Sequence, residues 1–102
     1  MSFEINYALA FVPQALKEWK KLDPHTRQLF KSRLKDRLQA PRLASAQLRG
    51  HTDRYKIKLQ ALGYRLVYEV RDHEVLVVVV AVGRRDGHAV YLAANGRDGA
   101  KH

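Results

Sequence analysis

The sequence predicts a two-layer α+β domain of element order β-α-α-β-β-β, with a helical hairpin packed on one face of a mainly antiparallel sheet. Three observations carry this prediction. Apolar residues alternate with polar ones near the N-terminus, recur at helical spacing over residues 13–40, and form three further strand-like segments between residues 55 and 82. We expect residues 1–94 to form a single domain and residues 95–102 to form a flexible C-terminal tail.

The N-terminal half contains the first strand and both helices of the hairpin. Over residues 3–11 large apolar side chains alternate with polar residues or alanine, as in a strand with one buried face. A helix is expected over 13–22, where apolar residues recur every three or four positions. Asp23 and Pro24 suit the N-cap and first position of a second helix, which ends near residue 40. Because the link is so short, the two helices must run antiparallel.

The C-terminal half predicts a three-stranded meander over 55–59, 64–70 and 75–82. Gly63 helps to turn the first hairpin. The last strand is apolar at every position, so it is expected to be central and covered on both faces over part of its length. Residues 89–94 are expected to form one or two turns of helix.

Alternation along the first two meander strands separates an apolar face from a cationic one. Residues directly opposite in an antiparallel pair share a face of the sheet. Pairing Tyr55 and Ile57 with the apolar positions of 64–70 therefore determines which residues of both strands point to each face. A two-residue turn at 61–62 would place Lys58 opposite Arg65. The helical hairpin covers the apolar face, and no helix is expected on the other. That other face collects Lys56, Lys58, Arg65, Glu69 and Arg71.

The charge balance indicates a polyanionic partner. The chain has 19 Lys and Arg against 10 Asp and Glu, a formal net charge of +9 and a pI near 10.2. Nucleic acid is the commonest polyanion for a basic domain, although a basic surface can also serve solubility alone. The cations on the outer faces of the helices, Lys31 and Lys35 among them, can be solvated or can contact RNA.

Several other function classes are excluded or disfavoured. The chain has no cysteine, which excludes disulfides, cysteine zinc sites and thiol nucleophiles. Its five histidines are scattered without metal-ligand spacing, so we expect neither metal nor cofactor. The longest apolar run spans 75–82, far short of the ~20 residues of a membrane helix, and no signal peptide is evident. We therefore expect a cytoplasmic protein without membrane contact.

The cationic face fits the requirements of a single-stranded RNA site, namely cations for phosphates and an aromatic ring for an unstacked base. An RNA 2′-hydroxyl attacks the adjacent phosphate when its proton is removed, the phosphate charge is stabilised and the leaving oxygen is protonated. Neighbouring cations disfavour the protonated form of a lysine, so Lys56 or Lys58 is a candidate base. His88 is a rival, and the other histidines are expected in loops, caps or the tail.

Six segments together resemble the RelE toxin family, with consistent spacing over about residues 7–94. They are Ala15-Leu16-Lys17-Glu18-Trp19-Lys20-Lys21-Leu22, Lys35 to Pro41, Leu48-Arg49-Gly50, Tyr55-Lys56-Ile57-Lys58-Leu59, Gly63-Tyr64-Arg65-Leu66-Val67-Tyr68, and Val82-Gly83-Arg84-Arg85 through Tyr91. The resemblance implies a ribosome-dependent messenger RNA interferase that cleaves in the A site of the 70S ribosome. It also implies a RelB-like antitoxin and products with 2′,3′-cyclic phosphate and 5′-hydroxyl ends.

The resemblance also implies roles for individual residues. Lys56 and Lys58 match lysines of the active groove, with Lys56 near the base role. Arg65 matches the arginine that stabilises phosphate charge, Arg85 the proposed general acid, and Tyr91 the tyrosine that stacks on a base. Further RNA contacts are expected from Arg49, Arg84, His88, Arg71, Lys31 and Lys35.

The sequence departs from the family pattern at two places, and a second function remains open. Gly87 and His88 differ from the family pattern, and residues 95–102 lack its usual basic and apolar ending. The alternative is a ParE-like toxin, which shares this fold but inhibits DNA gyrase and has no RNA-cutting groove. Against it stands the intact set of groove residues, namely Lys56, Lys58, Arg65, Arg85 and Tyr91.

Overall fold

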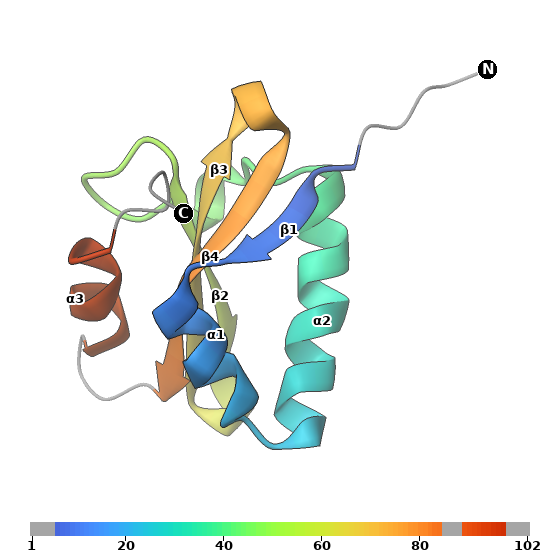
Figure 1. The fold of residues 1–102 in the computed structure, drawn as a ribbon, viewed down its shortest axis with the longest axis vertical. Coiled ribbons are helices and arrows are strands. Elements are labelled where there is room, and N and C mark those ends of the chain that lie inside the picture. The colour runs from blue at the N-terminus through green and yellow to red at the C-terminus, as the bar shows by residue number, and fades with distance from the viewer. Residues whose placement is uncertain (1–5, 85–88, 98–102) are drawn as a thin grey trace.

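A single sheet with helices on both faces forms the protein (Figure 1). The computed structural model describes residues 6–84 and 89–97. Within them the strand order is β1-β4-β3-β2, with β1 parallel to β4 and the other neighbours antiparallel. The elements in chain order are β1 (Ala8–Phe11), α1 (Pro13–Lys20), α2 (Pro24–Gln39), β2 (Arg54–Leu59), β3 (Tyr64–Arg71), β4 (Leu76–Arg84) and α3 (Ala89–Asn95).

The ends of α2 follow from its local chemistry. The Asp23 side chain accepts the N–H of Thr26 at 3.1 Å, and Pro24 occupies the first turn. At the other end Ala40 adopts a non-helical conformation because the ring of Pro41 disfavours the helical one for the residue before it. The predicted boundaries of α2 are therefore confirmed to within about one residue, whereas α1 ends at Lys20, two residues before its predicted end.

The register of the β2–β3 hairpin agrees with the parity that the sequence predicts. Lys58 pairs with Arg65, and Tyr55 pairs with Tyr68, whose ring it stacks on at 5.7 Å. The loop between the strands ends at Gly63, which has a φ of 72° and so occupies the left-handed region that glycine adopts without strain. The prediction that Lys58 and Arg65 lie opposite each other is confirmed.

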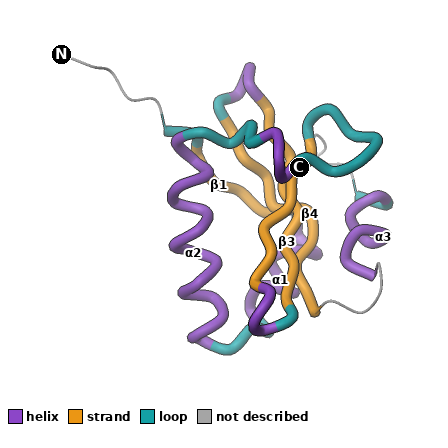
Figure 2. Tube along the Cα trace, turned by 180° about the vertical axis from the view of Figure 1, so that it is seen from behind, coloured by secondary structure: helices purple, strands orange, loops and turns teal. Residues whose placement is uncertain are grey.

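The main core lies between this sheet and the helices α1 and α2. Phe30 of α2 is fully buried and contacts the ring of Trp19, which in turn contacts Phe11 of β1. The buried hydroxyl of Tyr68 donates to the carbonyl of Pro41 at 2.7 Å, so the end of α2 is fixed to the middle of β3. Figure 2 shows α2 on one side of the strands.

The opposite face of the sheet is partly covered by α3, as both views of the chain show (Figures 1 and 2). The expectation that no helix covers this face was wrong for β3 and β4. Val67, Val78 and Ala81 lie on this face and are buried. A Cβ added to Gly83 would lie 3.4 Å from a methyl group of Val90, so the helix approaches the strand closely. The cationic face therefore remains open only beside β2 and the start of β3.

A β-bulge interrupts the pairing of β3 with β4. Val67 pairs with Ala81 but the next residue, Tyr68, pairs with Val79, which leaves Val80 as the extra residue on β4. Before the bulge the even-numbered residues of β4 point to the α3 face of the sheet, and after it the odd-numbered residues do. The expectation that this strand is central is confirmed, since residues 77–82 are all buried.

The chain after α3 is attached to the sheet as far as Arg97. This residue, which was expected in a flexible tail, forms an ion pair with Glu18 at 2.9 Å. Residues 98–102 lie outside the described residues. Among the helices of the described ranges, none has the length and apolar character that a membrane crossing needs.

Candidate nucleic-acid interface

Three cations lie together on the sheet face opposite α1 and α2. Lys56 and Lys58 project from β2 to the same face because they are two residues apart, and Arg65 shares it because it pairs with Lys58. The lysines are half-buried, and Arg65 is buried, with one guanidinium nitrogen donating to the carbonyl of Tyr64 at 3.2 Å. A buried guanidinium opposite Lys58, with Lys56 on the same face, gives a site for phosphate charge.

A cavity of about 320 Å³ joins this cluster to α3. Lys56 lines it from β2 and Tyr91 from α3, so an aromatic ring and a cation face the same space. The remaining lining residues come from the loop before β2 and the end of α3, and they are Leu48, Arg49, His51 and Asn95. This is where a base can stack while its phosphate is bound.

Sequence reasoning missed two residues of this cavity, His51 and Asn95. The Nε2 atom of His51 lies 3.1 Å from the Oδ1 atom of Asn95, across 44 positions of the chain. His51 was expected in a loop, cap or tail without a function, and Asn95 was expected in the tail. No local pattern links residues so far apart, and only the docking of α3 brings them together.

A second cavity of about 640 Å³ lies on the outer side of β2 and shares Lys56 with the first. Cations line it from both layers, with Arg33 and Arg37 on α2 and the two lysines on β2. Arg37 also supports the strand, since its guanidinium donates to the carbonyl of Lys56 at 3.1 Å and to the Tyr68 hydroxyl at 3.0 Å. Within the described part of the chain no carboxylate lines either cavity, so both attract phosphates.

The other predicted RNA-binding residues are dispersed. Arg84 pairs with Tyr64 on the α1–α2 side of the sheet, with its guanidinium 5.5 Å from the tyrosine ring. Lys31 and Lys35 are exposed on α2, in the layer opposite α3. Arg49 lines the first cavity together with Lys56 and Tyr91. Arg85 and His88 lie outside the described residues.

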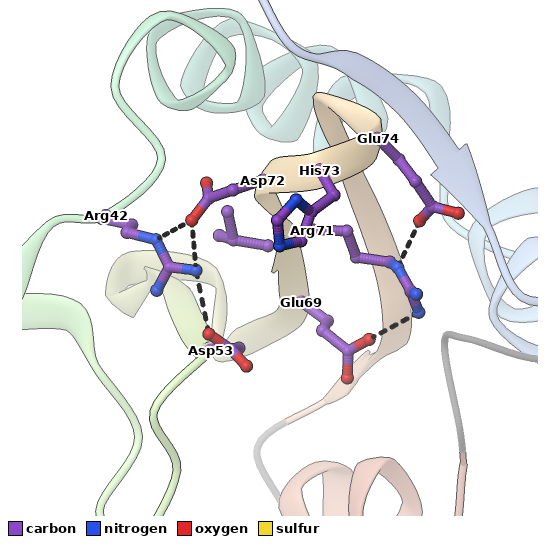
Figure 3. Close-up of a pocket in the computed structure, with 8 residues that line it drawn as sticks. Arg42, Asp53, Glu69, Arg71, Asp72, His73 and Glu74 are labelled. Atoms are coloured by element: carbon purple, nitrogen blue, oxygen red, sulfur yellow. Dashed lines mark hydrogen bonds and ion pairs between the residues drawn. The ribbon is translucent and has the colours of Figure 1, made fainter.

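Arg71 lies at the far end of β3, in a pocket of mixed charge of about 430 Å³ (Figure 3). Its guanidinium pairs with Glu69 and Glu74, so it does not join the cationic cluster. In the same pocket Arg42 bridges Asp53 and Asp72, each at 2.9 Å, and these carboxylates raise the pKa of Arg42. No His, Asp and Glu group of the described ranges is arranged to hold a metal ion.

This far end and the start of α2 predict an acid-sensitive stability. Hydrogen bonds from Tyr7 and Arg42 lower the pKa of Asp72, and hydrogen bonds from the Thr26 side chain and backbone lower that of Asp23. Both carboxylates therefore contribute stability above their ordinary value of 3.8, and this contribution is lost as the pH falls through their lowered values.

Urea unfolding from pH 7 to pH 2, followed by tryptophan fluorescence, measures this loss. We expect the combined Asp23→Asn and Asp72→Asn variant to lose less stability than the wild type between about pH 4 and pH 2. Asp36→Asn, on the exposed surface of α2, measures the effect of removing one exposed carboxylate, and twice this effect is the reference for the double variant. Parallel profiles for the double variant and the wild type would contradict the assignment.

Comparison with known proteins identifies the family. Residues 9–88 match the family model described as the ParE toxin of the type II toxin-antitoxin system parDE. The chain is 48% identical over 88 residues to the mRNA interferase toxin RelE of Escherichia coli K12, covering 86% of this chain and 93% of that protein. A putative RelE-like toxin protein of E. coli is 47% identical over 93 residues, or 91% and 98% of the two chains.

Solved structures agree with these matches. A mutant of E. coli RelE in the free state superposes with a TM-score of 0.84 at 46% identity, covering 90% of this chain and 97% of that one. RelE in the intact E. coli RelBE toxin-antitoxin complex gives 0.76 at 48% identity, covering 78% and 98%. The expected α+β fold is confirmed by these likenesses. The chain therefore belongs to the RelE/ParE family of toxins of type II toxin-antitoxin systems, and its identity to RelE places it with the RelE toxins.

Proposed function

We propose that this protein is the toxin of a type II toxin-antitoxin pair and acts as an endoribonuclease on messenger RNA. The observation that carries the proposal is the 48% identity to an mRNA interferase over 86% of this chain and 93% of that protein. The cluster of Lys56, Lys58 and Arg65 supports it, because these residues share one face of the sheet and Lys56 lines a cavity with Tyr91. Such a surface suits an unstacked base and its phosphate.

The proposed chemistry assigns one task to each group. Lys56 accepts the 2′-hydroxyl proton, and the 2′-oxygen attacks the adjacent phosphorus while the bond to the 5′-oxygen breaks. Arg65 and Lys58 stabilise the negative charge that develops on the phosphate. Arg85 protonates the leaving 5′-oxygen, and Tyr91 stacks on a base and orients the phosphate. The products are a 2′,3′-cyclic phosphate and a 5′-hydroxyl.

We further propose the biological setting of this reaction. The substrate is messenger RNA in the A site of the 70S ribosome, and cleavage there inhibits translation in the cytoplasm. The partner is a RelB-like antitoxin, as in the E. coli RelBE complex. A small domain gains stability from such a partner by mass action, since the antitoxin binds the folded form.

Primer extension on messages from translating ribosomes tests the proposal. Addition of the purified chain is expected to produce new message ends within codons at the A site, with 5′-hydroxyl chemistry at the downstream fragment. Pre-incubation with the cognate antitoxin is expected to abolish these ends. Messages that remain intact while active toxin is present would refute the nuclease assignment.

The family model described as a ParE toxin favours a second candidate function, inhibition of DNA gyrase. Because RelE and ParE toxins share this fold, the model match alone does not separate them. A supercoiling assay with purified gyrase does so. Loss of supercoiling with intact messages would support this candidate and overturn the first.

A further inference from the structure

On the side of β4 that faces β1, the strand pairing stops at Val79, and side chains bind the backbone beyond it. β1 pairs with β4 only over residues 76–79, so within the described ranges the backbone groups of Val80 and Val82 on this edge lack a strand partner. A buried backbone group without a partner is costly. The carboxylate of Glu18 accepts the Val82 N–H at 3.2 Å, and the guanidinium of Arg97 donates to the Val80 carbonyl at 2.7 Å.

Glu18 and Arg97 also bind each other through two hydrogen bonds of 2.9 Å. Both side chains are mostly buried, with exposed fractions of 25% and 18%. A bidentate arginine–carboxylate pair fixes the relative orientation of its partners as well as their distance. The pair therefore attaches the segment after α3 to α1 across 79 positions of the chain.

Arg54 of β2 binds the same segment from the cationic face of the sheet. Its side chain is buried and donates to the carbonyls of Ala94 and Arg97. The carboxylate of Glu69 orients it, with a contact of 3.2 Å to the Arg54 Nε atom. A cation that binds the last carbonyls of a helix satisfies acceptors that have no partner within the helix. We call Glu18, Arg54 and Arg97 the C-terminal latch.

The latch determines where Tyr91 lies. Seven residues of α3 are too few for a stable isolated helix, so tertiary contacts set its position. Arg54 and Lys56 are two positions apart on β2, roughly 7 Å. Tyr91 lies three positions before Ala94, close to one helical turn of about 5.4 Å. When Arg54 binds the Ala94 carbonyl, Tyr91 therefore comes beside Lys56, and both line one cavity.

We propose that the C-terminal latch positions Tyr91 against Lys56 and is required for efficient RNA cleavage without touching the RNA. The proposal rests on the proposed nuclease function and adds positioning residues to it. A misplaced orienting group can cost a large factor in rate, because the reacting atoms need close alignment. A latch that served only stability would lower activity through unfolding alone.

Arg27 provides a matched control for Arg97. Its guanidinium binds the carbonyls of Lys20 and Leu22, at 3.3 and 2.8 Å, at the end of α1. Arg27 thus binds carbonyls at the end of α1 as Arg54 binds carbonyls at the end of α3. Among the described residues it does not line the cavity that holds Tyr91. Arg97→Gln and Arg27→Gln are then compared at a temperature well below the unfolding of both.

The latch predicts a specific pattern in a double-mutant cycle with Tyr91→Ala. Arg97→Gln is expected to lower kcat/KM for ribosome-bound message about tenfold, whereas Arg27→Gln stays close to wild type. In the Tyr91→Ala background, Arg97→Gln is expected to have no further effect, because the group it positions is absent. Arg97→Lys, which keeps the charge, should restore part of the activity.

Hydrogen exchange gives a readout that does not need catalysis. Amides of residues 89–97 are expected to exchange faster in Arg97→Gln than in wild type and Arg27→Gln. The proposal would be overturned if Arg97→Gln lost as much activity in the Tyr91→Ala background as in the wild-type background, or no more than Arg27→Gln loses. If the wild type cuts no message, the proposed function fails instead, and unchanged exchange at 89–97 would still overturn the latch by itself.

Discussion

Replacing Arg65 by methionine is expected to lower the rate of message cleavage by about 10²-fold or more. Arg65 is buried and pairs with Lys58 on the cationic face of the sheet, where phosphate charge develops in the proposed reaction. Methionine keeps an unbranched apolar stem of similar length, so the packing around this buried position is largely retained. The expected loss therefore reports on charge stabilisation and not on folding. Single-turnover cleavage on programmed ribosomes measures it.

Two further variants sharpen this test. Arg65→Lys keeps a positive charge but not the planar fork, and its rate is expected to lie between those of wild type and Arg65→Met. Lys20→Met removes one charge from the exposed end of α1 and controls for the lower net charge of the protein. A rate for Arg65→Met equal to that of Lys20→Met, at matched folded fraction, would exclude a role for Arg65 in the reaction.

Replacing Phe30 by alanine is expected to lower the free energy of unfolding by about 3–5 kcal/mol. The side chain is fully buried between α2 and the sheet and contacts the ring of Trp19 at 6.2 Å between centroids. Loss of the ring removes buried apolar surface and leaves a cavity. Because small domains are stabilised by only about 5–15 kcal/mol, this is a large fraction of the total.

The only tryptophan of the chain lies beside the substituted ring and reports on unfolding. Urea titration followed by Trp19 fluorescence should show a lower midpoint for Phe30→Ala. The neighbouring Leu29 is 36% exposed, so Leu29→Ala is expected to cost much less and serves as the matched control. Equal midpoints for the two variants would show that the ring does not anchor the core.

Sequence patterns predicted those parts of the fold that short-range periodicity encodes. The alternation of Tyr55, Ile57 and Leu59 determined the faces of β2, and hence the shared face of Lys58 and Arg65. The position of α3 could not be derived in this way, since its contacts join residues 40 to 79 positions apart. For the same reason no function was expected for His51, although it lines the cavity with Tyr91.

The face of Arg84 was unpredictable for a different physical reason. Residues 75–82 are all apolar, so the sequence offers no alternation in which an extra residue would be visible. The bulge at Val80 changes the parity of everything that follows it in β4. Arg84 consequently lies beside Tyr64 and away from the cationic cluster.

The bulge also determines how closely α3 approaches the sheet. With the additional residue, the two smallest side chains of the strand, Ala81 and Gly83, face α3, while Val82 turns into the core. In an uninterrupted strand the isopropyl group of Val82 would stand beneath the helix and hold it away from the sheet. One inserted residue thus lets α3 approach β4 closely, and Tyr91 of this helix lines one cavity with Lys56 of β2.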